Sequence, residues 1–294
     1  MPCGLQAYEA IGGASRCPAR QSLAVAAGIS LDDSYDDFPR IEETFGERLD
    51  ESLAPRGPDS LWAEFDRLHP PEGGLVVDVG CGEGDASIEL ARRHPVRVHG
   101  VDPIERHIEL ASAAARAAAV DERVDFSVGV AEATGLPDSS ASMIWTKEAL
   151  MYADLDAAFA EFRRVLRPGG AVFAYQVCTG SAMSDKEAKA FWHEAAGARS
   201  VRPEHLHDAA AGAGLTTLFR TEFGSEWGEY QQERSGAGGR RLVHAARLLR
   251  QPSRYIEEFG EENYRIMLND CLWHVHRMTG RLTGVAFGFR LDAP

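Results

Sequence analysis

The sequence predicts an α/β protein with a Rossmann-like, seven-stranded, mostly parallel sheet and helices on both faces. Three observations carry this expectation. Valine-rich runs such as "GLVVDVG" alternate with stretches of helical periodicity from residue 74 onward. A glycine-rich turn follows the first of these runs. Crossovers between successive parallel strands are right-handed, which leaves only a few strand orders.

Ahead of the sheet, residues 1–30 form a variable segment rich in Ala, Gly and Ser, and residues 31–72 form a helical cap. The apolar residues of the first cap helix recur at helical spacing: Phe38, Ile41, Phe45, Leu49 and Leu53. This helix is expected to end before Pro55, and a second, shorter one before Pro70.

The predicted core spans residues 73–226, and its strands are expected at 74–80, 96–102, 124–131, 141–148, 171–177 and 215–223. Residues 227–282 carry few strand signals and are predicted to be a helical lid. Residues 283–294 supply the last core strand. An insertion of this length between two strands is usually functional.

Composition excludes several classes of function. A formal net charge of −14 argues against nucleic acid and against anionic membranes, which both attract clustered Lys and Arg. Five scattered cysteines without a C-x-x-C pair indicate neither a zinc site nor a disulfide framework. With no signal peptide or long apolar window evident, a cytoplasmic protein is expected. Whether it forms homo-oligomers is left open.

The stretch "LVVDVGCGEGDAS" suggests what the protein binds. Its glycines follow the spacing Gly80-x-Gly82-x-Gly84, which lets a backbone loop approach a ligand at a helix N-terminus. Asp78 would repel a pyrophosphate but attract a ligand that carries an ammonium and a sulfonium; alternatively it only caps the loop. Asp102 ends the second strand, where a carboxylate usually binds ribose hydroxyls.

At this point a family resemblance is evident. The motifs "VVDVGCGEGDAS", "VHGVDPIERHIELA", "FSVGVAEATGLPDSSASMIW" and "FRRVLRPGGAVFAY" resemble those of class I S-adenosylmethionine-dependent methyltransferases over about residues 74–177. The resemblance implies S-adenosylmethionine as cofactor, with Asp78 and the glycine loop at its methionine half and Asp102 at its ribose. It assigns the remaining cofactor site to Cys81, Pro103, Ile104, Val130, Ala131, Glu132, Thr146 and Lys147. The family often has an acid where Val130 stands, which leaves the adenine amino group to Glu132 or to water.

The acceptor site is sought in "WTKEALMYADL", at the carboxyl end of the fourth strand. This stretch resembles bacterial prenyl C-methyltransferases, in which an alkene attacks the methyl group. By that resemblance Glu148 would stabilise a carbocation, supported by Tyr152 and by a ring from Tyr35. Alternatively, Glu148 is a carboxylate at a helix start or binds the cofactor's ammonium.

The commoner reaction on this architecture is O- or N-methylation of a small metabolite, for which His274 is a candidate general base. A histidine on an apolar stripe is, however, more often a core residue. His274 and His276 invite a metal, but nothing nearby completes a ligand set, so no metal is expected. Trp227 and Trp273 either line an apolar acceptor pocket or form the core of the lid.

The sequence thus predicts a methyltransferase that acts on a small, partly apolar acceptor in specialised metabolism. Two alternatives remain: C-methylation of a prenyl chain, and binding of S-adenosylmethionine without methyl transfer, as in a cyclase. A nicotinamide oxidoreductase is disfavoured by the glycine spacing and by Asp78.

Overall fold

The computed structural model describes residues 31–195 and 197–293 of the 294-residue chain. The chain divides into two compact units, residues 1–53 and 54–294. In the first unit the described part is helix α1 (Leu31–Leu49), which begins and ends earlier than the apolar periodicity indicates. Each unit is described by itself, and all elements that follow belong to residues 54–294.

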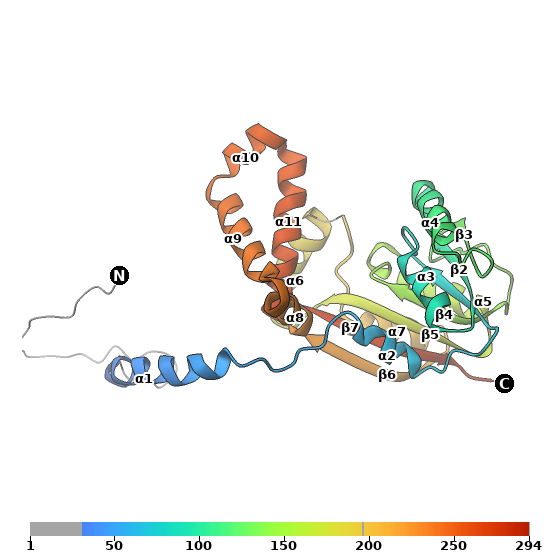
Figure 1. The fold of residues 1–294 in the computed structure, drawn as a ribbon, viewed down its shortest axis with the longest axis horizontal. Coiled ribbons are helices and arrows are strands. Elements are labelled where there is room, and N and C mark those ends of the chain that lie inside the picture. The colour runs from blue at the N-terminus through green and yellow to red at the C-terminus, as the bar shows by residue number, and fades with distance from the viewer. Residues whose placement is uncertain (1–30, 196, 294) are drawn as a thin grey trace, which may run out of the picture. The chain divides into compact units, whose positions relative to one another are not determined.

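The larger unit is built on one seven-stranded sheet in the order β3-β2-β1-β4-β5-β7-β6 (Figure 1). Its strands are β1 (Leu75–Val79), β2 (Arg97–Asp102), β3 (Val124–Val128), β4 (Ala141–Lys147), β5 (Leu166–Thr179), β6 (Leu215–Gly224) and β7 (Leu282–Leu291). Strands β1 to β5 are parallel, whereas β7 runs antiparallel to both β5 and β6. The predicted fold class is therefore confirmed.

Helices cover both faces of this sheet. Their bounds are α2 (Ser60–Asp66), α3 (Asp85–Arg93), α4 (Glu105–Ala117), α5 (Leu155–Val165), α6 (Asp185–Lys189) and α7 (Pro203–Gly212). A π-helical turn, Ala190–Ala195, follows α6. On one face Phe65 of α2 packs edge-on against Trp145 and Phe173. On the other, Phe159 of α5 packs edge-on against Phe289 of β7. Buried aromatic rings thus fix the layers on both sides.

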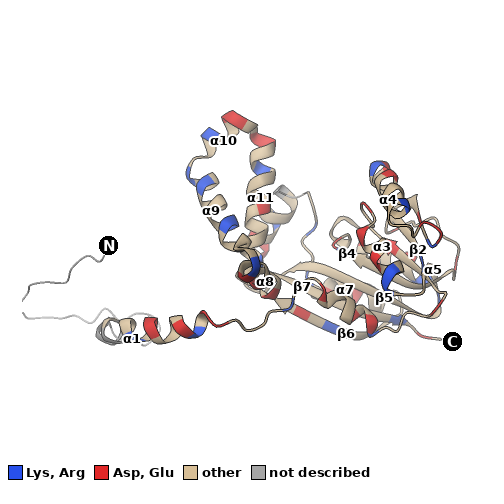
Figure 2. Cartoon of the chain, viewed as in Figure 1, with Lys and Arg blue, Asp and Glu red and all other residues tan. Residues whose placement is uncertain are grey.

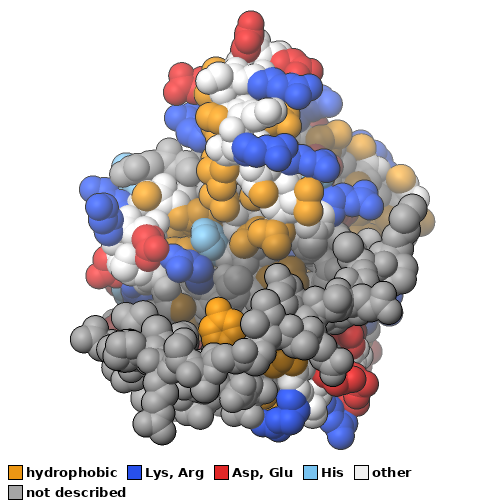
Figure 3. Space-filling view, turned by 90° about the vertical axis from the view of Figure 1, so that its left-hand side faces the viewer, with side chains coloured by type: hydrophobic (Ala, Val, Ile, Leu, Met, Phe, Trp, Pro, Cys, Tyr) orange, Lys and Arg blue, Asp and Glu red, His pale blue; other side chains and the backbone are white. Residues whose placement is uncertain are grey.

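The predicted lid is a set of four helices between β6 and β7: α8 (Glu226–Ser235), α9 (Ala237–Arg250), α10 (Pro252–Phe259) and α11 (Glu261–Met278). It has a small core of its own around Ala245, Leu248 and Cys271. Figure 2 shows basic residues along α9 and acidic residues near α10. Figure 3 shows hydrophobic side chains between them on the lid, at the top of that view.

Among the helices of residues 31–195 and 197–293, none combines the length and the apolar character that a bilayer-spanning helix needs. Within the same residues, no group of three or more His, Cys, Asp or Glu side chains is placed to hold a metal ion.

Candidate cofactor and acceptor site

The glycine loop connects β1 to α3 and brings the backbone against the loop after β4. Gly80 and Gly82 both have left-handed backbone conformations, with φ of 77° and 53°. A Cβ at Gly80 would collide with the Cβ of Ala149, so only glycine allows this approach. Gly82 has open space around its Cα, where a ligand can come close. The glycines thus shape both the turn and its accessible side.

Asp78 lies buried at the end of β1, under the glycine loop. Its Oδ2 accepts a hydrogen bond of 2.6 Å from the hydroxyl of Ser87 in α3. Burial raises the pKa of Asp78 to about 7, against the lowering effects of the Ser87 hydrogen bond and the charge of Lys147. These contacts fit the loop-capping alternative. A contact with the ligand's ammonium stays a prediction.

Asp102, at the end of β2, joins two segments of the site. Its Oδ2 accepts from the backbone N–H of Gly82 at 3.0 Å, and its Oδ1 from that of Ile104 at 3.0 Å. The Nδ1 of His107 lies 2.9 Å from the same Oδ1. Spacing along the sequence predicted a role for Asp102 but not for His107. The signal in the sequence was that His107 lies five residues after Asp102, in the first turn of α4.

A pocket of about 500 Å³ opens at the carboxyl ends of β1, β2 and β4, within the size range of small-molecule sites. Of the predicted cofactor residues, it is lined by Gly80, Asp102, Pro103, Ile104, Val130, Ala131, Glu132 and Lys147. It is also lined by His107 and by both predicted catalytic residues of the β4 loop, Glu148 and Tyr152. The structure therefore brings together segments that are up to about 70 residues apart in the chain, at the edge of the sheet where open α/β folds bind ligands.

Five predicted cofactor residues do not line this pocket: Asp78, Cys81, Gly82, Gly84 and Thr146. Cys81 is a buried residue of the turn, and burial raises the pKa of its thiol well above the usual range. Thr146 is fully buried in β4. Among these five residues, Asp78 bonds to Ser87 and Gly82 bonds to Asp102, which itself lines the pocket. Their contacts with a cofactor stay predictions.

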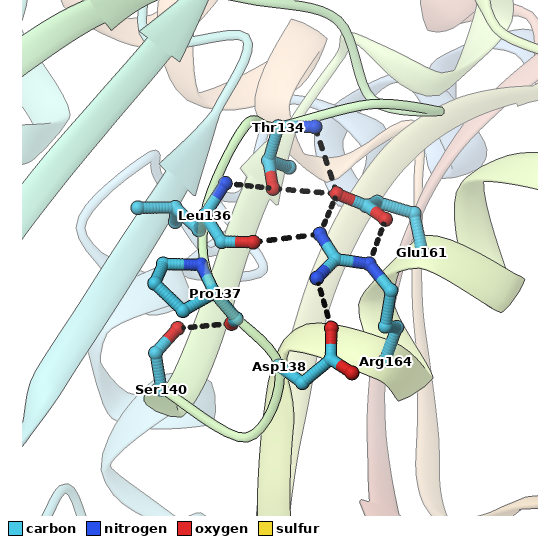
Figure 4. Close-up of polar contacts among 7 residues, drawn as sticks. All are labelled: Thr134, Leu136, Pro137, Asp138, Ser140, Glu161 and Arg164. Atoms are coloured by element: carbon cyan, nitrogen blue, oxygen red, sulfur yellow. Dashed lines mark hydrogen bonds and ion pairs between the residues drawn. The ribbon is translucent and has the colours of Figure 1, made fainter.

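The segment predicted to read the adenine is held from behind by α5 (Figure 4). The backbone N–H and the hydroxyl of Thr134 both donate to Oε1 of Glu161, at 2.8 and 2.7 Å. Arg164 donates to Glu161 and also to the carbonyl of Leu136. Burial opposes ionisation of Glu161, but the hydrogen bonds from Arg164 and Thr134 outweigh it and lower its pKa. The carboxylate stays charged and fixes the loop.

Glu132 is engaged with the same helix. Its Oε1 accepts a hydrogen bond of 2.7 Å from the backbone N–H of Asp154, the residue that caps the N-terminus of α5. This bond ties the pocket wall to the helix start. No local sequence pattern indicates this long-range partner, and the role of Glu132 at the adenine edge stays a prediction.

Glu148 occupies a strained position at the end of β4. Its φ is +56°, a value that non-glycine residues adopt at a cost, and often at functional sites. Its backbone N–H donates to the carbonyl of Tyr175 in β5 at 2.8 Å. A 3₁₀ turn, Leu150–Tyr152, then brings the exposed Tyr152 to the same pocket. Both residues line the same pocket, and their roles in catalysis stay predictions.

The predicted residues of the lid lie elsewhere. Trp227 is buried and stacks on Tyr175 with ring centroids 4.7 Å apart, and Trp273 packs edge-on against Trp192. His274 lies 3.8 Å from Asp270, and burial lowers the pKa of its imidazole. None of the three lines the 500 Å³ pocket. Trp227 belongs to the main hydrophobic core and Trp273 packs against that core, so the alternative that they form the lid's own core is wrong. The roles of all three residues toward an acceptor stay predictions.

Two other predictions concern the histidine pair and the cap. His276 packs edge-on against Phe191, whereas His274 lies near Asp270 of its own helix, so the two rings have different surroundings. Tyr35 lies on α1 with its side chain exposed. Because α1 belongs to the separate unit, a contribution of Tyr35 to the acceptor site stays a prediction.

Comparison with known proteins agrees with this geometry. The family described as "Methyltransferase domain" matches residues 76–170. Methyltransferase GfsG of Streptomyces halstedii is 32% identical over 143 residues, which cover 48% of this chain and 47% of the relative. Geranyl diphosphate 2-C-methyltransferase of Saccharopolyspora erythraea is 36% identical over 95 residues, covering 32% and 33% of the two chains. The chain therefore spans about half the length of these curated relatives, or less.

Solved structures extend the likeness beyond the matched domain, at the level of the fold. The [4+2]-cyclase SpnF superposes with a TM-score of 0.62 at 20% identity, covering 80% of this chain and 82% of that one. Geranyl diphosphate methyltransferase in complex with GPP and sinefungin gives a TM-score of 0.59, also at 20% identity, with coverages of 79% and 77%.

Proposed function

We propose that the chain, whose residues 76–170 match a methyltransferase domain, is a class I S-adenosylmethionine-dependent methyltransferase that transfers the methyl group of this cofactor to a small, partly apolar acceptor. The observation that carries the proposal is the 500 Å³ pocket. It gathers the glycine loop, Asp102 and Glu148 at the carboxyl ends of the parallel strands. An oxygen or a nitrogen is the acceptor atom in this proposal.

The residues present fit the cofactor. A carboxylate has about four lone-pair sites, and Asp102 has three partners in Gly82, Ile104 and His107. It lines the pocket and keeps capacity for a ribose hydroxyl. When bound, S-adenosylmethionine supplies a methyl group on a positively charged sulfur. Asp102 and the glycine loop would hold its ribose and its amino-acid end.

On the acceptor side, Glu148 is the proposed catalytic residue because it lines the pocket from a rigid and strained position. For an acceptor hydroxyl, its carboxylate would take up the proton that the oxygen loses. Tyr152 would orient the acceptor from the next turn. The proposed lid excludes water from the reacting atoms.

C-methylation of a prenyl chain is a second candidate. The same two residues favour it, since an acid and an aromatic ring at the pocket would stabilise a cation on the acceptor. A curated relative is named a geranyl diphosphate 2-C-methyltransferase. The position of the transferred methyl group on the product, read by NMR, separates this reaction from O- or N-methylation.

A third candidate, binding of the cofactor without methyl transfer, is supported by the likeness in fold to a [4+2]-cyclase. Methyl-labelled S-adenosylmethionine, incubated with phenolic, amine and prenyl acceptors, tests this. Methyl transfer predicts a labelled product with at least one acceptor class, whereas the third candidate predicts none. Calorimetry with S-adenosylmethionine and with NAD provides the binding control, and tighter binding of NAD would overturn all three candidates.

We also propose that the protein works in the cytoplasm on intermediates of specialised metabolism. The net charge of −14 supports a small-molecule partner over nucleic acid or an anionic membrane.

A further inference from the structure

Arg277, near the end of α11, is the lid residue that reaches over to β5. Its Nη2 donates to the hydroxyl of Tyr175 at 3.3 Å. Its guanidinium carbon lies 5.0 Å from the ring centre of Trp227, which itself stacks on Tyr175 at 4.7 Å. The Tyr175 hydroxyl and the Trp227 ring hold the guanidinium in one orientation, because the hydrogen bond and the cation–π contact act on the same planar group.

Arg277 has no carboxylate partner in the part of the chain that the structure describes. Among the described residues, no Asp or Glu lies within ion-pair distance of Arg277, although the chain carries a net charge of −14. Two other lid arginines are paired: Arg241 with Asp270 at 2.6 Å and Arg281 with Glu187 at 2.7 Å. In the described structure the buried Nε atoms of Arg277 and of Arg281 both lack a hydrogen-bond partner, so the missing carboxylate is what distinguishes Arg277.

Burying a donor of a charged group without an acceptor costs free energy, which an anion placed there would recover. Guanidinium groups bind carboxylate and phosphate oxygens with two parallel N–H donors. Arg277 has used one of its five N–H donors on Tyr175. Tyr175 is fully buried, whereas Arg277 is partly exposed, so a ligand would contact the arginine and not the tyrosine.

The guanidinium and the proposed catalytic residue share one neighbour, Tyr175. The carbonyl of Tyr175 accepts the backbone N–H of Glu148, and the hydroxyl of the same Tyr175 accepts from Arg277. Burial is the main cause that raises the pKa of Tyr175. The charges of Arg277 and Glu148 act on that pKa in opposite directions, so both lie near this one side chain. Arg277 does not line the 500 Å³ pocket but a small separate cavity, together with Trp227 and His274. An acceptor beside Glu148 would have to extend toward the lid to meet the guanidinium.

We propose that Arg277 is a specificity-determining residue that recognises an oxyanion, a carboxylate or a phosphate, on the acceptor. The inference rests on the proposed function, because it takes Glu148 to mark the acceptor site. Tyr175 is the positioning residue, since it fixes the guanidinium and is itself buried. An acidic acceptor would then stabilise the closed lid most, because the arginine that binds its anionic group belongs to the lid.

The test compares ligands that differ only in this charge. Calorimetry with the protein saturated with S-adenosylhomocysteine measures the binding of benzoate against benzyl alcohol, and of octanoate against octanol. The acids are expected to bind at least about tenfold more tightly, as a charge-assisted pair would provide. Arg277→Gln should abolish this preference and Arg277→Lys should retain part of it. Arg265→Gln, an exposed change on the same helix, should leave it intact.

Equal binding of acid and alcohol by the unaltered protein, including no binding of either, would overturn the inference. So would a preference that survives in Arg277→Gln. Thermal unfolding of each variant shows whether the change has merely loosened the lid, because a purely structural role would lower the affinity for acids and alcohols alike. Binding of S-adenosylhomocysteine is measured separately, so failure of the cofactor assignment is distinguishable from failure of this proposal.

Discussion

Glu148 and Tyr175 are joined across neighbouring strands by a 2.8 Å hydrogen bond from the backbone N–H of Glu148 to the carbonyl of Tyr175. The bond holds Glu148 at a φ of +56°, which turns the chain out of β4 directly over the pocket. Backbone strain of this kind persists only where the surrounding structure imposes it. The position of the proposed catalytic carboxylate is therefore set by the main chain of the sheet.

Replacing Glu148 tests its role in turnover. Glu148→Gln should lower kcat by about 10²-fold or more, because a positioned carboxylate contributes that much as a base. Affinity for S-adenosylmethionine should stay close to that of the unaltered protein. Steady-state kinetics with a labelled methyl group, together with calorimetry, measure the two quantities. Parallel losses in both would instead assign Glu148 to the cofactor.

Removing the carboxylate of Asp102 should weaken cofactor binding. Asp102→Ala loses charge-assisted hydrogen bonds to the ribose, worth about 1–3 kcal/mol, so the Kd should rise roughly 5- to 150-fold. Calorimetry with S-adenosylmethionine measures this change. Asp121→Ala, on an exposed turn before β3, is the matched control and should have no effect. An unchanged Kd in Asp102→Ala would rule out the ribose contact.

Asp78 should make the unliganded protein less stable as the pH rises. Its pKa is about 7 in the folded protein because of burial, against an ordinary value of 3.8, so the folded state keeps a proton that the unfolded state loses. The neutral form stabilises the fold fully below about pH 4, and this contribution is lost as the pH rises through 7. In Asp78→Asn this loss should disappear.

The expected gain of Asp78→Asn over the unaltered protein is about 4 kcal/mol at pH 8, from the rise of the pKa from 3.8 to about 7 at roughly 1.36 kcal/mol per pKa unit, and close to zero at pH 4. Urea unfolding at several pH values, without cofactor, measures it. Parallel pH profiles for the two proteins would show that Asp78 titrates in the folded state as it does in the unfolded one.

Gly80 should tolerate no side chain. Gly80→Ala combines a positive φ with a collision against Ala149, so it should cost more than the roughly 1 kcal/mol of left-handed strain alone. Gly135→Ala isolates the strain, because Gly135 has a similar φ of 76° and nothing within 4 Å. Denaturant unfolding compares the two variants.

A further substitution, Ala149→Gly, removes the Cβ atom with which a Cβ at position 80 would collide. Adding it to Gly80→Ala should recover the part of the loss beyond that of Gly135→Ala. If Gly80→Ala and Gly135→Ala are equally stable, the close approach of the two loops makes no energetic difference.

The sequence was sufficient for the sheet, since each strand is a short β-branched run between helical segments. It was also sufficient for the pocket's main walls, because the carboxyl ends of parallel strands meet at one edge. Less could be predicted where a partner comes from far along the chain. Leu61 and Phe65 were assigned to a cap, but they are buried in the core of the larger unit. The spacing of these apolar residues predicts that one face of the helix is buried. It does not predict which part of the protein packs against that face.

Side-chain partners were the least predictable part of the site. Glu132 accepts from Asp154 and Thr134 donates to Glu161, and both bonds connect the loop after β3 to α5. Such bonds depend on how two elements pack, which no local pattern encodes. Arg277 was likewise not singled out, because an arginine near the end of a helix is ordinary until its position beside Tyr175 and Trp227 is known.

The place of β7 in the sheet has a consequence for how the protein is made. On a ribosome, β6 emerges well before β7, yet β7 is the strand that lies between β6 and β5. Until residues 282–291 are synthesised, the nascent β6 has no neighbour and exposes an open backbone edge, while β1 to β5 can already pair. The strands that form the 500 Å³ pocket can therefore pair during synthesis. The lid, in contrast, is connected to the sheet only through β6 until β7 pairs with β5 and β6.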